Sequence, residues 1–529
     1  MRTRREFLAL AGRLGVGAAS LGGLASLRPA LASAGTPRTI ELEVHEVEWE
    51  LAPGKTVSAM TYNGQVPGPE IRAREGERLR VVLKNSLSEP TTIHWHGVDV
   101  PNSMDGVPGI TQKPVQSGET FAYEFEARPA GTRWYHTHFD EHHQMDLGLA
   151  APLIIEPADK EPLPYDREVT LVLDDWATGT GTPVPDTDSG IAGGRGSTGG
   201  MMDGAMGGMM GGGMRGMMGG GGMGGMMRGA DEPAYDLMTI NGKSYPATEP
   251  PRVKRGERVR VRIINASSEH THVVRLAGHR LHLTHTDGNP LRAVVEVDAI
   301  PIAPAERYDV LLVADRPGAW WLQCTQPGHA AAGERMVVAY DGHERRAPVE
   351  PERDISGRRP WQYGLGKGRP VLAPPTGATR TFELTLSGGM MGSDVWTINR
   401  KVYPNTDPLR FRKGDRARIV LRNTSMEAHP MHLHGQSFAL LAANGTRYAE
   451  PIVKDVVDVE PHMGSAVIAF TRAQPRRLVL PLPQAHAHEG RHDRPREDRI
   501  ANGARPRSRS RRRDPRRRQG GRPGVRLGG

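Results

Sequence analysis

One pattern that occurs three times along the chain restricts the folds open to it. Each copy has an asparagine, then a Gly-acid-Arg triplet, then a second asparagine nine residues after that glycine. Before the second asparagine, apolar and basic residues alternate, as in residues 259–263 (VRVRI), which is the period-two pattern of a strand. The copies are Asn63-Gly64, Gly76-Glu77-Arg78 and Asn85; Asn241-Gly242, Gly256-Glu257-Arg258 and Asn265; and Asn399, Gly414-Asp415-Arg416 and Asn423. We therefore predict an all-β protein that uses one β-sandwich unit three times.

Length and composition agree with three such units. A chain of 529 residues has room for about three domains of ordinary size, and 65 Gly and 43 Pro suit short strands joined by many turns. We predict domain one at residues 36–160, domain two at 161–345 and domain three at 377–475, with a linker at 346–376.

Three His-x-His pairs carry the strongest chemical signal. They are His94-Trp95-His96, His136-Thr137-His138 and His432-Leu433-His434, and His429 precedes the last pair. Side chains alternate between the two faces of a strand, so both imidazoles of a pair point the same way. Neutral imidazole suits copper, zinc and iron, so the pairs predict a metal cluster without choosing the metal. His142 and His143, which follow the second pair, are expected to be exposed.

The register of the repeat indicates where this cluster lies. Nine residues after the second asparagine stand His94, Val274 and His432, and eleven residues after it stand His96, Leu276 and His434. Domains one and three therefore hold equivalent ligands, whereas domain two lacks them. We predict a metal cluster shared across an interface between domains one and three.

The stretches HWHG, GTRWYHTH and HPMHLHG resemble three of the four copper motifs of the multicopper oxidases, in the copper-resistance and cuprous-oxidase branch. The resemblance runs from about residue 40 to residue 475. It implies three cupredoxin-like domains, a type 1 copper that takes electrons from substrate, and a trinuclear cluster that reduces dioxygen to water. By position, it assigns His94 and His432 to type 2 copper, His96, His136, His138 and His434 to type 3 copper, and His429 to type 1 copper.

Asp105 matches the acidic residue that the family carries near the cluster. The resemblance implies a proton donor for oxygen reduction, and the alternative is a turn aspartate before Gly106. The segments around residues 174–176, 305–309 and 454–457 also match the family, and we interpret them as structural, not chemical.

The fourth motif of the family, His-Cys-His-x3-His-x4-Met, is absent. Residues 476–492 contain no cysteine, although one synonymous codon choice for them, read one base later, encodes VDWFFHCHKLMHMKAGM. We hypothesise a frameshift near Pro475, with residues 476–529 as an out-of-frame, disordered tail. The tail holds 17 Arg against five acids, a balance of +12, so the net charge of +9 leaves about −3 for residues 1–475. It has no aromatic residue for stacking on bases, which argues against a nucleic-acid arm.

The single cysteine, Cys324, lies in domain two, where GTRWYHTH aligns without gaps on residues 318–325. Cys324 and His329 have the spacing of a blue-copper loop, Glu334 occupies the place of the axial methionine, and His270 or His272 lies near the position of His429. One interpretation is a type 1-like copper site in domain two. The alternative is a buried structural thiol beside an exposed histidine.

Two further segments bear on function. Residues 1–34 contain Thr3-Arg4-Arg5-Glu6-Phe7-Leu8, an apolar run and Ala32-Ser33-Ala34, which predicts a twin-arginine signal peptide, export to the periplasm and no stable membrane span. Residues 193–229 form a Gly/Met insertion with 11 methionines, whose thioethers favour Cu(I). The alternative is a neutral low-complexity linker.

The resemblance implies a monomeric oxidase of Cu(I) in copper tolerance, with phenols or other small reducing substrates as further electron donors. Its partners would be the donor, O2 and the twin-arginine translocase. As printed, the chain lacks part of its type 1 and type 3 ligands, so we expect impaired catalysis. A non-catalytic protein that sequesters periplasmic Cu(I) is the second hypothesis, and a phenol-oxidising laccase is the third.

Overall fold

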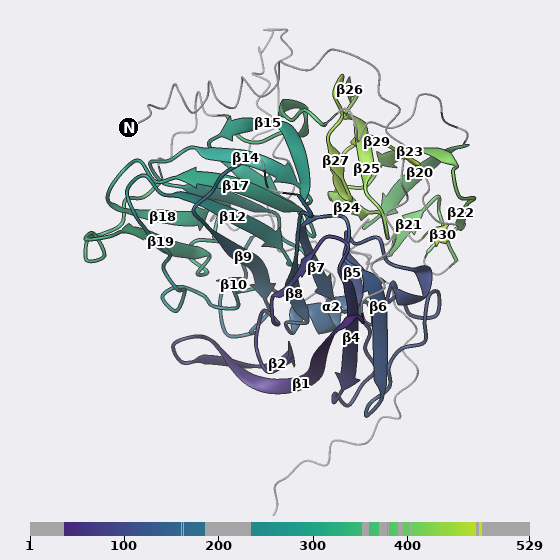
Figure 1. Ribbon diagram of the computed structural model, residues 1–529, viewed down its shortest axis with the longest axis horizontal. Coiled ribbons are helices and arrows are strands. Elements are labelled where there is room, and N and C mark those ends of the chain that lie inside the picture. Colours follow the sequence, from purple (N-terminus) through teal and green to yellow (C-terminus); the bar gives the residue numbers. More distant parts are fainter. Residues whose placement is uncertain are drawn as a thin grey trace, which may run out of the picture. The chain divides into compact units, whose positions relative to one another are not determined.

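The computed structural model describes residues 36–185, 234–351, 359–471 and 476–478, apart from short gaps at 160, 162, 370–377, 379, 390–394 and 403–404. The predicted signal peptide, the Gly/Met insertion and most of the predicted tail lie outside the described residues. Within those residues, strands dominate and α2 (Glu141–Asp146) is the single α-helix, which confirms the all-β prediction. The strands β1–β8, β9–β19 and β20–β30 form three successive groups, coloured purple to blue, teal, and green to yellow in Figure 1.

The first group forms two four-stranded sheets. One has the order β2-β1-β4-β6 and the other β3-β8-β7-β5. The bounds are β1 Arg38–Ala52, β2 Lys55–Tyr62, β3 Ile71–Arg74, β4 Arg78–Asn85, β5 His94–His96, β6 Thr120–Glu126, β7 Gly131–His136 and β8 Ala150–Glu156, with a 3-10 turn η1 at Asn102–Met104. A separate hydrophobic core fills the space between these sheets, around Trp95 and Tyr135.

The second group forms a six-stranded sheet, β10-β9-β12-β17-β14-β15, and a five-stranded sheet, β11-β19-β18-β13-β16. The bounds are β9 Arg167–Trp176, β10 Leu237–Ile240, β11 Arg252–Val253, β12 Arg258–Asn265, β13 His272–Leu276, β14 Leu281–Thr286, β15 Asn289–Val297, β16 Ile300–Ile302, β17 Arg307–Val313, β18 Ala319–Cys324 and β19 Arg335–Tyr340.

The third group has a large sheet in the order β21-β20-β23-β29-β25-β26, with β27 paired to β25, and two small sheets, β22-β30 and β24-β28. The bounds are β20 Arg380–Gly388, β21 Trp396–Ile398, β22 Leu409–Phe411, β23 Arg416–Asn423, β24 His429–His432, β25 Phe438–Ala443, β26 Thr446–Arg447, β27 Val453–Lys454, β28 Val456–Val459, β29 Ser465–Thr471 and β30 Arg476–Leu478, and a 3-10 turn η3 at Tyr363–Leu365 precedes them.

The threefold repeat is confirmed down to its hydrogen bonds. The first asparagine of each copy, Asn63, Asn241 and Asn399, has positive φ, and its side-chain oxygen accepts a backbone N–H from the neighbouring strand. The second asparagine ends a strand that pairs in parallel with β1, β9 or β20. Its buried amide donates to two backbone carbonyls that follow, as Asn85 does to Glu89 and Val115. Asn265 and Asn423 make the equivalent bonds, so the repeated residue fixes the loop that carries the next strand.

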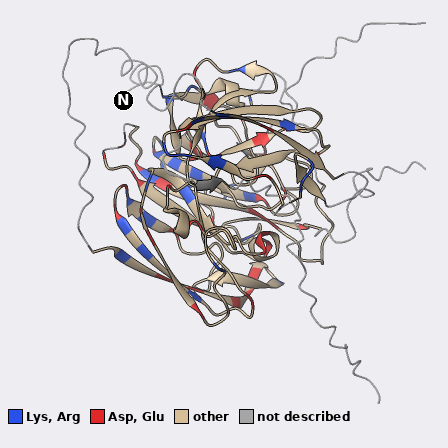
Figure 2. Cartoon of the chain, turned by 90° about the vertical axis from the view of Figure 1, so that its right-hand side faces the viewer, with Lys and Arg blue, Asp and Glu red and all other residues tan. Residues whose placement is uncertain are grey.

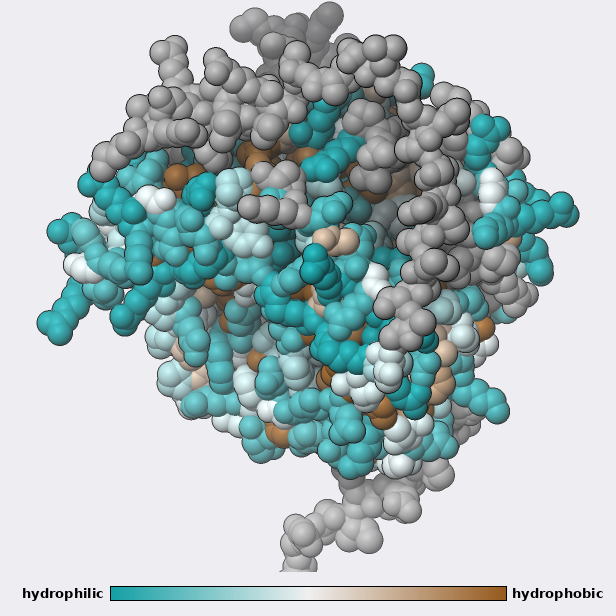
Figure 3. Space-filling view, in the orientation of Figure 1, coloured by the Kyte–Doolittle hydropathy of each residue, from teal (hydrophilic) through white to brown (hydrophobic). Residues whose placement is uncertain are grey.

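Apolar side chains from all three groups meet at the seam between them. Trp134 and Met145 of the first group, Ile264 of the second and Val456 of the third belong to one buried cluster. Basic and acidic residues are interspersed over the strands (Figure 2), and hydrophilic residues cover most of the described face seen in Figure 3.

Candidate metal centre

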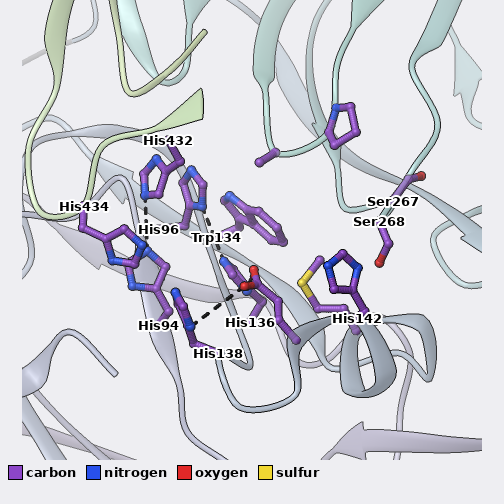
Figure 4. Close-up of a pocket in the computed structure, with 14 residues that line it drawn as sticks. His94, His96, Trp134, His136, His138, His142, Ser267, Ser268, His432 and His434 are labelled. Carbon is purple, nitrogen blue, oxygen red and sulfur yellow. Dashed lines mark hydrogen bonds and ion pairs between the residues drawn. The ribbon is translucent and has the colours of Figure 1, made fainter. Parts of the chain in front are cut away.

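The six histidines assigned from sequence to type 2 and type 3 positions line one pocket at this seam. They are His94, His96, His136, His138, His432 and His434, and we call them the seam site. β5 and β7 pair so that His94 lies opposite His136, while β24 ends at His432 and delivers the third pair from the other side. Figure 4 shows the six imidazoles together, with His142, Ser267 and Ser268 across the pocket. His142 was expected to be exposed, but it lines this pocket, because α2 turns it inward while His143 stays exposed.

Hydrogen bonds to one ring nitrogen of each histidine identify the nitrogen left for a metal. His94 Nδ1 donates to the backbone oxygen of Asp105 (2.8 Å), and His432 Nδ1 donates to the backbone oxygen of Asp455 (2.9 Å). Both Nε2 atoms therefore remain for coordination, and they lie 3.3 Å apart. With metal–imidazole bonds of about 2.0–2.1 Å, this separation suits two ligands of one ion.

A second pair follows from the same reasoning. His136 Nδ1 contacts the backbone oxygen of Thr137 at 2.6 Å, which leaves Nε2. His96 instead donates from Nε2 to the carboxylate of Asp455 at 3.2 Å, which leaves Nδ1. His96 Nδ1 and His136 Nε2 lie 3.4 Å apart. One metal position can therefore be held by the Nδ1 of one imidazole and the Nε2 of the other.

The third pair is His138 and His434, whose rings lie 5.1 Å apart. His434 Nδ1 is 3.3 Å from a carboxylate oxygen of Asp105. The Nε2 atoms of both histidines are buried without a hydrogen-bond partner. A buried polar atom with no partner is costly, and a metal ion would satisfy these two. The seam site thus offers three pairs of nitrogen donors for three metal positions.

The electrostatics of the seam keep five of these imidazoles neutral, as metal ligands must be. Burial lowers the pKa of His94, His96 and His136 well below the ordinary histidine value. For the same reason, the pKa of His432 falls to about 3 and that of His434 to about 4. Neutral imidazole is the form that binds copper.

Asp455 is a site residue that the sequence reasoning classed as purely structural. Its buried carboxylate accepts hydrogen bonds from both Nη atoms of Arg307 (2.5 and 2.7 Å), from Nη1 of Arg133 (3.3 Å) and from Nε2 of His96. Burial raises the pKa of Asp455, but Arg307 and His96 outweigh this and hold it well below the usual range. Asp455 therefore ties all three domains together and also orients two ligands. In the sequence, Asp455 could be noticed only because residues 454–457 match the family, and its contacts with Arg307, Arg133 and His96 appear only in the fold.

His429, assigned to type 1 copper, lies apart from this pocket. Its Nε2 is 2.9 Å from Ser425 Oγ, its Nδ1 is buried without a partner, and burial lowers its pKa to about 4. No cysteine of domain three lies beside His429 among the described residues, because the single cysteine of the chain, Cys324, belongs to domain two.

In domain two, His272, Cys324, His329 and Glu334 come together and are all buried; we call them the Cys324 site. The alternative placed an exposed histidine beside the thiol, and this part of it is wrong, because the loop after β18 folds His329 inward to 0% exposure. Of the two histidines proposed from sequence, His272 joins the cluster, whereas His270 Nδ1 bonds Asp175 at 2.9 Å.

Comparison with known proteins identifies the family. Sequence profiles described as multicopper oxidase match residues 43–160, 216–342 and 375–480. The multicopper oxidase MmcO of Mycobacterium tuberculosis is 33% identical over 427 residues, which cover 77% of each chain. The chain belongs to the multicopper oxidases. A copper resistance protein A homolog of Pseudomonas syringae pv. tomato is 28% identical over 503 residues, covering 77% of this chain and 84% of its own. A solved multicopper oxidase from Pseudomonas thermotolerans has TM-score 0.62 at 24% identity and covers 85% of this chain and 97% of that one, which shows the shared cupredoxin fold.

Membership of this family makes the protein an oxidoreductase with O2 as acceptor and copper as cofactor. The seam site fits copper because imidazole is a common copper ligand. A bound cation would also satisfy Nε2 of His138 and Nε2 of His434, which are buried without a hydrogen-bond partner. The sequence-based identification and the three pairs of ligands therefore agree. In the part of the chain that the structure describes, no helix has the length and apolarity needed to cross a bilayer.

Proposed function

We propose that this protein oxidises Cu(I), one electron at a time, and uses four such electrons and four protons to convert O2 into two molecules of water. The observation that carries the proposal is the arrangement of three nitrogen pairs at the seam, two of which join domain one to domain three. Bound copper at these positions would supply the electron storage and oxygen chemistry. The protein itself holds the ligands neutral, orients them and excludes bulk water.

Asp105 is the proposed proton donor of the seam site. It follows η1, its side chain is 4% exposed, and its carboxylate lies 3.3 Å from His434 Nδ1 and 3.6 Å from His94 Nδ1. A carboxyl group this close to two ligands can hold a proton inside a pocket with little access to water. Its backbone oxygen separately fixes the ring of His94, so the same residue would position one ligand and serve as the acid.

Cu(I) is proposed as the electron donor on two grounds. Relatives of this chain are named copper resistance protein A, and the Gly/Met insertion supplies soft thioether sulfur that favours Cu(I). We also propose twin-arginine export to the periplasm, where the protein would act as a monomer in copper tolerance. Phenols are the competing donors, because relatives named laccase also match.

The chain with the printed C-terminus is proposed to bind copper but to turn over little. His429 lacks a thiolate partner in domain three, and each type 3 position of the seam has two described imidazoles where the family resemblance implies three. Sequestration of copper without catalysis is therefore the second candidate function for this literal sequence.

The decisive experiment compares two proteins in an oxygen electrode with Cu(I) as donor. One is the printed chain, and the other is the chain whose reading frame is shifted after Pro475 to restore the fourth copper motif. We expect rapid O2 uptake only from the second. Rapid uptake by the printed chain would overturn the proposed impairment, and no uptake by either, when both hold copper, would overturn the oxidase function. Replacing Cu(I) by a phenol in the same assay identifies the preferred donor.

A further inference from the structure

We propose that the Cys324 site is a mononuclear copper site of type 1 ligand composition, formed entirely by domain two. His272 lies at the start of β13, Cys324 at the end of β18, and His329 and Glu334 in the loop before β19. Their ligand atoms all lie within 4.8 Å of one another, and all four residues are buried. None belongs to the seam site, so the proposal does not depend on the proposed oxidase function.

The imidazoles present their Nδ1 atoms to a common centre. Glu334 Oε1 lies 2.8 Å from His272 Nδ1, and Oε2 lies 2.9 Å from His329 Nδ1. The far nitrogen of His272 is held by Ser267 Oγ at 2.7 Å, which fixes the ring with Nδ1 facing inward. The two carboxylate oxygens therefore lie beside the two nitrogens that a metal would bind.

The sulfur of Cys324 is prepared to carry negative charge. The backbone N–H groups of Val273 and Gln326 both point at Sγ, at 3.2 and 3.4 Å. Amide donors stabilise a thiolate, and hydrogen bonds around the cysteine sulfur tune copper sites of this class.

Domain three supplies an internal comparison. There Ser425, two residues after Asn423, contacts His429 Nε2 at 2.9 Å and leaves its Nδ1 facing inward. In domain two Ser267, two residues after Asn265, contacts His272 Nε2 in the same way. The equivalent serine therefore holds an equivalent histidine, and in domain two the remaining ligands are present.

Two imidazoles and one thiolate, with a fourth weaker ligand, are the donor set of blue-copper sites, and Glu334 occupies the fourth place. Zinc is the competing metal, because it also accepts thiolate, imidazole and carboxylate in closed four-coordinate sites. The loop spacing Cys324-x4-His329-x4-Glu334 and the serine-held histidine favour copper.

The experiment uses the full-length protein with the printed sequence, freed of metal, titrated with Cu(II) and followed by visible absorption and electron paramagnetic resonance. The chain has one cysteine, so a thiolate-to-copper charge-transfer band can come only from Cys324. We expect such a band to grow as Cu(II) is added and to saturate at one copper ion per Cys324. It should disappear in Cys324→Ser and in His329→Ala, and it should persist in the matched control His429→Ala.

Glu334→Met is a further variant. Methionine has a similar side-chain volume and can still act as a ligand, but through sulfur in place of oxygen. We expect the band to shift in position without loss of intensity. Absence of the band from folded, copper-loaded protein would overturn the proposal. So would a competition titration in which Zn(II) occupies Cys324 and displaces Cu(II). If the printed chain shows the band but the chain with the restored fourth motif takes up no oxygen, the proposed oxidase function is contradicted and the Cys324 site is supported.

Discussion

The seam site and the Cys324 site are both built from cupredoxin units, but they are assembled differently. In the seam site, His94 pairs with His432 and His138 with His434, so domains one and three must each contribute a ligand. In the Cys324 site, every ligand lies within domain two. A site formed within one domain depends on that domain's own folding, whereas a shared site depends on how two domains are held.

Buried charges hold the domains at the seam. Asp455 of domain three is paired with Arg307 of domain two and Arg133 of domain one, and all three side chains are 0% exposed. The adjacent Lys454 bonds Asp287 (3.1 Å) and Glu306 (3.0 Å) of domain two. These contacts fix the seam site but do not touch the Cys324 site.

The largest expected effect separates the two sites through this network. Asp455→Ala leaves the guanidinium groups of Arg307 and Arg133 buried without their carboxylate, which costs about 3–5 kcal/mol of stability. We expect copper at the seam to be lost while the Cys324 band remains. Chemical unfolding measures the stability, and elemental analysis together with the visible spectrum measures the copper that remains. Asp415→Ala is the control, since Asp415 forms a partly exposed pair with Arg380 and should change stability by about 1 kcal/mol or less.

Acid should destabilise the copper-free protein in two ranges of pH, first through its buried histidines and then through Glu334. The folded pKa of His429 is about 4, below its unfolded value of 6.5, so below pH 6.5 the unfolded chain binds more protons and stability falls as the pH falls towards 4. The full shift corresponds to about 3 kcal/mol. Glu334 has a folded pKa of about 2 against 4.5 unfolded, so its contribution is complete above pH 4.5 and lost only below that.

Hydrogen exchange of the copper-free protein between pH 7 and pH 5 tests the first of these ranges. We expect β24, which carries His429, and β14, which carries His285 with a pKa of about 3, to lose protection as the pH falls through this range. Unchanged protection of both strands would contradict the assignment of these titrations to the histidines.

A smaller effect is expected at the serines that orient the histidines. Ser267→Ala frees the ring of His272 and should weaken copper binding at the Cys324 site about 10-fold, the lower end for loss of an outer-shell partner. Ser425→Ala, the matched change in domain three, should leave that affinity unchanged. Copper titration of the visible band measures both, and an equal effect of the two variants would show that the serine contact does not act locally.

The smallest effect concerns the repeat itself. In the first two copies glycine follows the left-handed asparagine, but in domain three Arg400 stands there with φ of +65°. Arg400→Gly should raise stability by about 0.5–1 kcal/mol, because only glycine adopts this conformation without strain. Gly64→Ala should lower it by a similar amount, since an added Cβ meets only the His45 ring at 3.5 Å and the cost is conformational. Thermal unfolding of both variants measures the difference.

The sequence by itself determined the repeat, the all-β fold and the six seam histidines. These follow from local rules: alternation along a strand places both imidazoles of a His-x-His pair on one face, and the repeated asparagines set the register in every copy. The missing fourth motif was also visible in the sequence, because a single cysteine can be counted without a structure.

Only the tertiary structure decided which nitrogen of each histidine is left for a metal, that Asp455 orients ligands from two domains, and that His272 and not His270 joins Cys324. These outcomes depend on contacts between residues far apart in sequence. His96 and Asp455, for instance, are separated by 359 positions and meet only because Arg307 and Arg133 draw the buried carboxylate to the seam. A buried charge is stable only when it is paired, and tertiary packing decides which residues pair with it, so no local sequence pattern predicts them.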